Sequence, residues 1–176
     1  MRRREQRAAP SRAGGVLFFP ALCLALFLFA GPVSAGTISV ETGEGFHHSP
    51  HTEAFFLRYQ TKAFELAGFD TYYEALAGGW NGKNRNEAVA LSLGILLPWH
   101  DDDRFFGSAG LGRASRTTEN LGVHFQFTFH VGYTRKFDAL NLSLAYVHFS
   151  TGKYFLGWEG PNFGENFLTA QAGWDF

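Results

Sequence analysis

The stretch Leu140-Asn-Leu-Ser-Leu-Ala-Tyr-Val-His-Phe-Ser150 decides the fold, because apolar and polar side chains alternate along most of it. Successive side chains of a β-strand point to opposite faces, so this stretch presents a leucine face and a polar face. A soluble sandwich would bury the leucine face, whereas a transmembrane barrel turns such a face to lipid and fills its interior with polar and small groups. The first face holds Leu140, Leu142, Leu144 and Tyr146, and the second holds Asn141, Ser143 and Ala145.

The C-terminal stretch favours the barrel. Residues 166–176 alternate in the same way and end on two aromatic side chains, Trp174 and Phe176. A final strand that ends in phenylalanine resembles the assembly signal of bacterial outer-membrane barrels. We therefore expect localisation in a bacterial outer membrane rather than a soluble β-sandwich.

Strand composition recurs along the chain, and most of the segments approach the roughly 9–11 residues that a tilted strand needs to cross a membrane. An eight-stranded barrel has an interior just filled by side chains, which argues against a porin-like channel. We predict an all-β fold, an eight-stranded antiparallel transmembrane β-barrel over residues 36–176. The expected strands are 37–46, 53–64, 70–80, 87–97, 104–114, 121–134, 139–150 and 166–176.

Residues 1–35 predict a secretory signal peptide cleaved after Ala35, because an arginine-rich start precedes a short apolar run and small residues. The run is short for a bilayer span, which disfavours the alternative of a retained anchor helix. Cys23, the only cysteine, lies there, so we expect no disulfide in the mature chain. The segment holds five of the 15 basic and one of the 16 acidic residues, leaving 10 and 15, a net charge near −5 that argues against nucleic-acid binding.

His148 and Ser150 continue the leucine face of the 139–150 segment, so they are expected to point toward lipid. With both termini in the periplasm, they would lie near the outer end of that strand, at the depth of the outer leaflet. A histidine beside a serine hydroxyl can act as a general base and make the serine a nucleophile for ester cleavage. The alternative is two polar residues at the membrane interface, where water satisfies both.

These residues carry a resemblance to a known family. The signal peptide, eight strands, FQF at Phe125–Phe127, YVHFS in the seventh strand and PNFG at Pro161–Gly164 resemble the outer-membrane lipid A 3-O-deacylase (PagL-type) family. The resemblance implies an enzyme that removes an ester-linked acyl chain from lipid A, with lipopolysaccharide and outer-membrane lipids as its partners. It implies His148 as base and Ser150 as nucleophile, a mechanism that needs no metal ion or cofactor.

The sequence departs from the family pattern at two places. Thr151 stands where an asparagine commonly follows the serine, and Asn166 stands where the family has a glutamate that orients the histidine. Alternation places Asn166 on the outward face, while Glu165 and Glu159 stay open as substitutes. An asparagine can orient an imidazole but adds no negative charge, so we expect a slower enzyme.

Two groups are candidate donors to the oxyanion of an ester hydrolysis, Asn162 and the backbone N–H of Gly152. The alternative for the PNFG stretch that holds Asn162 is a simple turn before a strand. Other readings of the chain also stay open: a non-catalytic barrel of the same family, an adhesion barrel, a barrel acyltransferase, and assembly as a homodimer.

Further polar stretches favour solvated loops over sites. His47, His48 and His51 could bind a transition metal, and His100–Asp103 could hold a hard cation, but neither has a complete ligand pattern. Loop cations could contact lipid A phosphates or be ordinary solvated charges. These cations are Lys83, Arg85, Arg113, Arg116 and Lys153.

Overall fold

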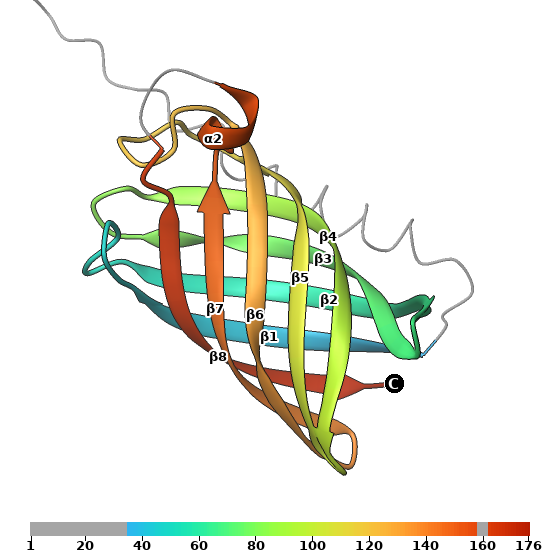
Figure 1. The fold of residues 1–176 in the computed structure, drawn as a ribbon. Helices are drawn as coiled ribbons and strands as arrows, with labels where there is room; N and C mark the ends of the chain where they lie inside the picture. Colours follow the sequence, from blue (N-terminus) through green and yellow to red (C-terminus); the bar gives the residue numbers. More distant parts are fainter. Residues whose placement is uncertain (1–34, 158–161) are drawn as a thin grey trace, which may run out of the picture. The chain divides into compact units, whose positions relative to one another are not determined.

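The computed structural model describes residues 35–157 and 162–176, which form a closed antiparallel β-barrel (Figure 1). Each strand pairs with its neighbour in the chain, and β8 pairs with β1 to close the barrel. The predicted signal peptide, apart from Ala35, lies outside the described residues. The strands are β1 (Gly36–Gly45), β2 (Glu53–Leu66), β3 (Phe69–Asn81), β4 (Asn86–His100), β5 (Asp103–Ala114), β6 (Phe125–Phe137), β7 (Leu140–Ser150) and β8 (Glu165–Asp175).

The predicted fold class is confirmed, and the sixth strand shows the largest shift from the expected bounds. Strand β6 begins at Phe125, whereas the alternation had suggested residue 121. Leu121 is fully buried in the loop before the strand, so its apolar character serves loop packing. One short helix occurs in the described residues, α2 (Lys153–Leu156), between Gly152 and Gly157. No helix in the described part of the chain is long and apolar enough to cross a membrane.

The two faces of the strands divide as a transmembrane barrel requires. On β7, Leu142 and Leu144 are 44% and 65% exposed, whereas Ser143 and Ala145 are buried in the interior. The same parity on the other strands gives an exterior of large apolar side chains. Exposed apolar residues around the wall include Ile38, Phe55, Tyr73, Leu91, Leu111, Phe129, Val131 and Leu168.

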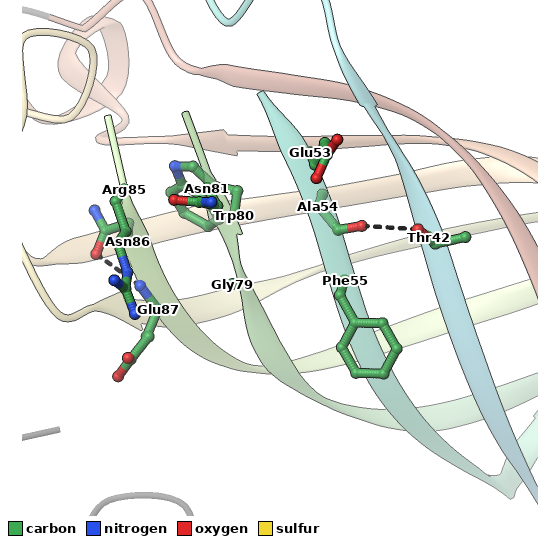
Figure 2. A pocket seen from close by; sticks show the side chains of 10 residues that line it. All are labelled: Thr42, Glu53, Ala54, Phe55, Gly79, Trp80, Asn81, Arg85, Asn86 and Glu87. Atoms are coloured by element: carbon green, nitrogen blue, oxygen red, sulfur yellow. Dashed lines mark hydrogen bonds between the residues drawn. The ribbon is translucent and has the colours of Figure 1, made fainter. Parts of the chain in front are cut away.

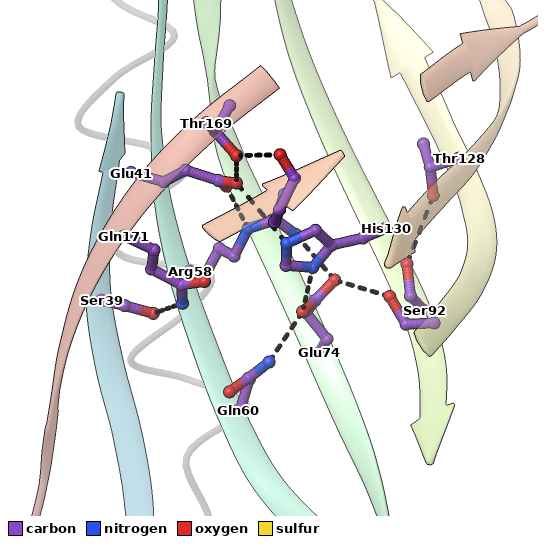
Figure 3. A network of polar contacts seen from close by, with 12 residues as sticks. Ser39, Glu41, Arg58, Gln60, Glu74, Ser92, Thr128, His130, Thr169 and Gln171 are labelled. Carbon is purple, nitrogen blue, oxygen red and sulfur yellow. Dashed lines mark hydrogen bonds and ion pairs between the residues drawn. The ribbon is translucent and has the colours of Figure 1, made fainter. Parts of the chain in front are cut away.

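The middle of the interior is a network of charged and polar side chains (Figure 3). Arg58 pairs with Glu41 at 2.5 Å and with Glu74 at 2.8 Å. The ring nitrogens of His130 lie 3.5 and 3.4 Å from the same two carboxylates. Buried charges need such partners, because an isolated ion in a low-dielectric interior is costly.

Aromatic packing fills the interior at the end of the barrel where β7 terminates. Phe149 lies 5.8 Å from Phe56 and 5.1 Å from Trp80, and Phe167 packs 5.4 Å from Trp80. Residues 147 and 149 of β7 belong to this apolar cluster, while residues 148 and 150 face outward. The cluster therefore fixes the strand segment that carries the histidine and serine.

The connections differ between the two ends of the barrel. Short turns join β2 to β3, β4 to β5 and β6 to β7, with Gly68 and Asp138 at positive φ. Longer connections join the remaining pairs at the other end, and α2 belongs to the one between β7 and β8 (Figure 1). His148 and Ser150 lie at this long-loop end.

Candidate active site

The candidate site is built by the register of β7 against β8. His148 pairs with Asn166 across these two strands, and both side chains project from the outer face. Ser150 lies on the same face two residues farther along β7. The predicted histidine, serine and orienting residue are therefore brought together on the outside of the barrel wall.

The imidazole of His148 is held from one side. Its Nδ1 lies 2.8 Å from Oδ1 of Asn166, and the hydroxyl of Tyr146 donates to the same oxygen at 2.7 Å. The rings of Tyr146 and His148 stack with centroids 6.1 Å apart at an interplanar angle of 20°. Because a carbonyl oxygen only accepts, Nδ1 carries the proton and Nε2 keeps its lone pair. This is the tautomer that a general base requires.

Ser150 is held by the turn that follows β7. Its Oγ donates to Oδ1 of Asn162 at 3.3 Å and accepts the N–H of Gly152 at 3.2 Å. The N–H of Thr151 also donates to Asn162 Oδ1, at 2.8 Å. The hydrogen bonds of the described residues include none between Ser150 and His148. Hydrogen bonds between catalytic residues are often long or poorly aligned before substrate binds, so a serine and a histidine without this bond can still form a working pair.

The arrangement of Asn162 differs from the predicted oxyanion donor. Asn162 turns its carbonyl oxygen toward Ser150 and Thr151, so its NH2 group would face the serine only after a half-turn of the amide. The backbone N–H of Gly152, in contrast, already points at the serine oxygen. The position needs glycine, because its φ is +67° and a Cβ would lie 2.2 Å from the Phe127 ring.

The two alternative orienting acids lie elsewhere. Glu165 begins β8 on its inner face, is fully buried and accepts a hydrogen bond from Ser49. Glu159 falls outside the described residues. Among the three open candidates, Asn166 is the one that contacts His148 in the described structure.

Packing fixes the other side of the imidazole. Gly164 has a φ of +74°, and a Cβ there would lie 2.5 Å from Cε1 of His148. The ring of Phe129 on β6 lies 6.1 Å from the imidazole. Exposed apolar side chains lie on the outer faces of β5 to β8 around the site: Leu111, Phe125, Phe129, Val131, Leu144 and Leu168.

Tyr146 is the site residue that sequence reasoning missed. The sequence places Tyr146 on the same face as His148, two residues before it, but alternation alone assigns it no role in the site. Its hydroxyl has a partner because Asn166, on the neighbouring strand, accepts hydrogen bonds from both Tyr146 and His148 at the same oxygen. The signal available in the sequence was the Tyr-x-His spacing on a lipid-facing strand.

The other polar stretches form no comparable site. No group of three His, Cys, Asp or Glu side chains in the described residues is arranged to hold a metal ion. In the histidine-rich loop, His48 packs on Phe163 with ring centroids 4.8 Å apart. Of the loop cations, Lys83 pairs with Glu119 at 2.8 Å.

A pocket of about 320 Å³ also opens at the long-loop end, but it lies on β1 to β4 rather than beside His148 (Figure 2). Phe55 and Gly79 line its wall, and Arg85 and Glu87 lie at its edge. His148 and Ser150 are not among the described residues that line it.

Comparison with known families supplies the deciding observation: the family model described as lipid A 3-O-deacylase (PagL) matches residues 53–175. The chain belongs to the PagL family. The match covers seven of the eight strands and includes His148, Ser150 and Asn166. A search of curated proteins found no match.

Solved structures show the same fold for this PagL-family chain. It is similar to the crystal structure of the outer membrane enzyme PagL, with 17% identity, a TM-score of 0.59, and coverage of 78% of this chain and 97% of that one. It is also similar to the N-terminal β-barrel domain of Pseudomonas aeruginosa OprF, at 13% identity, a TM-score of 0.57, and 81% and 97% coverage. The Yersinia pestis outer membrane protein Ail matches at 9% identity, a TM-score of 0.54, and 81% and 99% coverage.

Proposed function

We propose that this protein is an outer-membrane esterase that removes the ester-linked 3-O-hydroxyacyl chain from lipid A. Ser150 is the nucleophile, His148 the general base and Asn166 the residue that orients the imidazole. The observation that carries the proposal is the 2.8 Å contact between Asn166 Oδ1 and His148 Nδ1 on a lipid-facing wall. Polar groups on such a surface are costly unless they serve a function.

The first half of the reaction forms an acyl-enzyme. Ser150 Oγ rotates from Asn162 to His148 Nε2, gives up its proton there and attacks the ester carbonyl carbon. The N–H of Gly152 stabilises the resulting oxyanion, and a half-turn of the Asn162 amide would add a second donor. His148 then gives its proton to the departing sugar oxygen, so that the C–O bond breaks and a hydroxyl remains on lipid A.

The second half regenerates the enzyme. His148 takes a proton from water, the hydroxide attacks the acyl-serine, and the tetrahedral intermediate expels Ser150 Oγ, which recovers the proton from the imidazolium. The products are a free hydroxy fatty acid and deacylated lipid A.

The position of the site suits a substrate that never leaves the membrane. His148 and Ser150 sit at the long-loop end of a wall whose neighbouring side chains are apolar. We propose that this end faces the outer leaflet, so that an acyl chain lies along Phe129 and Leu144 while its ester reaches Ser150. The exposed cation Arg113, on the outer face of β5, is suited to a lipid A phosphate.

Because Asn166 replaces a carboxylate, we expect a slow rate of ester hydrolysis. Its oxygen orients the imidazole as a carboxylate would, but a neutral amide stabilises the imidazolium less than a charge does. This same residue supports the second candidate function, a barrel of the family that binds lipid without efficient chemistry. The two functions differ in whether lipid A loses an acyl chain.

The test is mass spectrometry of lipid A from cells that express the protein, its Ser150→Ala variant and, as a matched control, Ser143→Ala on the inner face of the same strand. We expect the parent and Ser143→Ala to remove one hydroxyacyl mass, and Ser150→Ala to leave lipid A intact. The released chain should appear as free fatty acid, whereas its transfer to an acceptor lipid would indicate an acyltransferase. Unchanged lipid A with a correctly inserted parent would refute the proposed activity.

A further inference from the structure

The backbone of Asn166 is anchored by the connection between β1 and β2. The N–H of Asn166 donates to Oγ of Ser49 at 3.3 Å, and its carbonyl accepts the N–H of Phe46 at 3.0 Å. The ring of Phe46 lies 5.8 Å from that of Tyr146, the second donor to the Asn166 side chain. The first inter-strand connection of the chain therefore contacts the candidate orienting residue from two sides.

Behind this anchor lies a buried carboxylate. Ser49 and Glu165 are 2% and 0% exposed, and the Ser49 hydroxyl donates to the Glu165 carboxylate. The hydroxyl thus accepts from the Asn166 N–H and donates to Glu165 at the same time. The ion pairs of the described residues include none with Glu165. The Ser49 hydroxyl meets one oxygen of its carboxylate, and the other oxygen is buried without a hydrogen-bond partner among the described residues.

The neighbouring loops join the same assembly. The side-chain NH2 group of Asn120 donates to the backbone carbonyl of His48 at 2.8 Å. The backbone carbonyl of Asn120 accepts the N–H of Gly164 at 3.3 Å. Gly164 in turn packs against the His148 imidazole. Three loops are thus linked behind the site. One link ends on Asn166 itself and another on Gly164, which lies against His148.

We propose that Ser49 and Glu165, which are both buried, are positioning residues that hold Asn166 where it orients His148. The inference rests on the proposed function and deepens it. Glu165 precedes Asn166 in the sequence, but its carboxylate is buried on the inner face of β8 and acts through Ser49 and the Asn166 peptide group. Because neither residue reaches the lipid-facing surface, their loss should affect turnover rather than substrate binding.

The test compares variants of the full-length protein, purified in detergent with lipid A as substrate. For Ser49→Ala we expect kcat to fall about ten-fold with KM unchanged, a loss typical of one removed hydrogen bond to a reacting assembly. Ser49→Thr keeps the hydroxyl and should restore most of the rate. Glu165→Gln keeps an acceptor and should lose less than Glu165→Ala.

Ser39→Ala is the matched control, because Ser39 is likewise a buried serine, 0% exposed, and accepts a buried hydrogen bond from Gln171 at 2.5 Å, away from the site. It should leave kcat and KM unchanged. A folded Ser49→Ala with the parent's kcat would overturn the inference, and so would an equal loss in Ser39→Ala, since the effect would then reflect general destabilisation.

A second measurement keeps the inference separate from the proposed function. If the parent proves inactive, nitrogen-15 NMR of the His148 ring in Ser49→Ala and in the parent still tests the positioning. We expect the hydrogen-bonded Nδ1–H signal of the parent to be lost or to exchange faster in the variant. Identical signals in both proteins would refute it.

Discussion

Replacing Asn166 by aspartate tests the proposed role of this residue most directly, because the two side chains have the same shape. The change puts a negative charge where Oδ1 now lies 2.8 Å from His148 Nδ1, and Tyr146 stays as a second donor to it. We expect Asn166→Asp to increase kcat, since a charged acceptor stabilises the imidazolium that forms as Ser150 is deprotonated.

The size of the increase follows from the geometry. Two unit charges roughly 4 Å apart attract by about 4 kcal/mol at an effective dielectric constant of 20. Asn166 is only 8% exposed, so burial of the new carboxylate cancels part of this attraction. If between a third and two thirds of the attraction survives, the barrier falls by about 1.3–2.7 kcal/mol, which is roughly 10- to 100-fold in kcat.

The assay is single-turnover release of hydroxy fatty acid from lipid A at neutral pH, with Asn166→Ala as the reference for lost orientation. We expect the order aspartate, asparagine, alanine from fastest to slowest, with thermal unfolding showing all three barrels folded. An aspartate variant no faster than the parent would refute the reasoning that the missing charge limits the rate.

Three further changes probe neighbouring contacts. Tyr146→Phe keeps the stacked ring but removes its hydrogen bond to Asn166, and it should lower kcat about five-fold in the same assay, as one lost hydrogen bond predicts. Gly164→Ala should lower kcat by about 100-fold, because the new methyl group displaces the imidazole and a small displacement of a catalytic group lowers the rate strongly. Gly68→Ala is the control for backbone strain, because Gly68 is also at positive φ but has open space around it. Arg58→Met leaves two buried carboxylates without their cation and should destabilise the barrel by about 3–5 kcal/mol in urea unfolding from lipid vesicles.

The sequence predicted the outward parity of the site because a strand has a period of two residues. Once β7 was assigned, His148 and Ser150 had to share the face of Leu144. Alternation along β8 favoured Asn166 on the outward face and Glu165 on the inward face, but it left open where the strand begins. The register of β7 against β8 could not be predicted from the sequence, because the residue of β8 that faces His148 depends on how the whole barrel closes.

The loop residues were harder to predict than the strand residues. Alternation says nothing about which end of the Asn162 amide faces Ser150, since that depends on the turn around Gly152. The same limit applies to Ser49, which stands between His48 and His51 in the sequence but lies buried against Glu165. Contacts between loops that are distant in sequence leave no periodic pattern.

The closure of β1 on β8 has a consequence for when the protein can act. Asn166 receives its anchors from Phe46 and Ser49, which lie just beyond β1, while its partner His148 comes from β7. The arrangement is complete only after the first and last strands, β1 and β8, have paired and closed the barrel. A chain still in transit would therefore be inert toward lipids, and enzymatic turnover would report on the final step of membrane assembly.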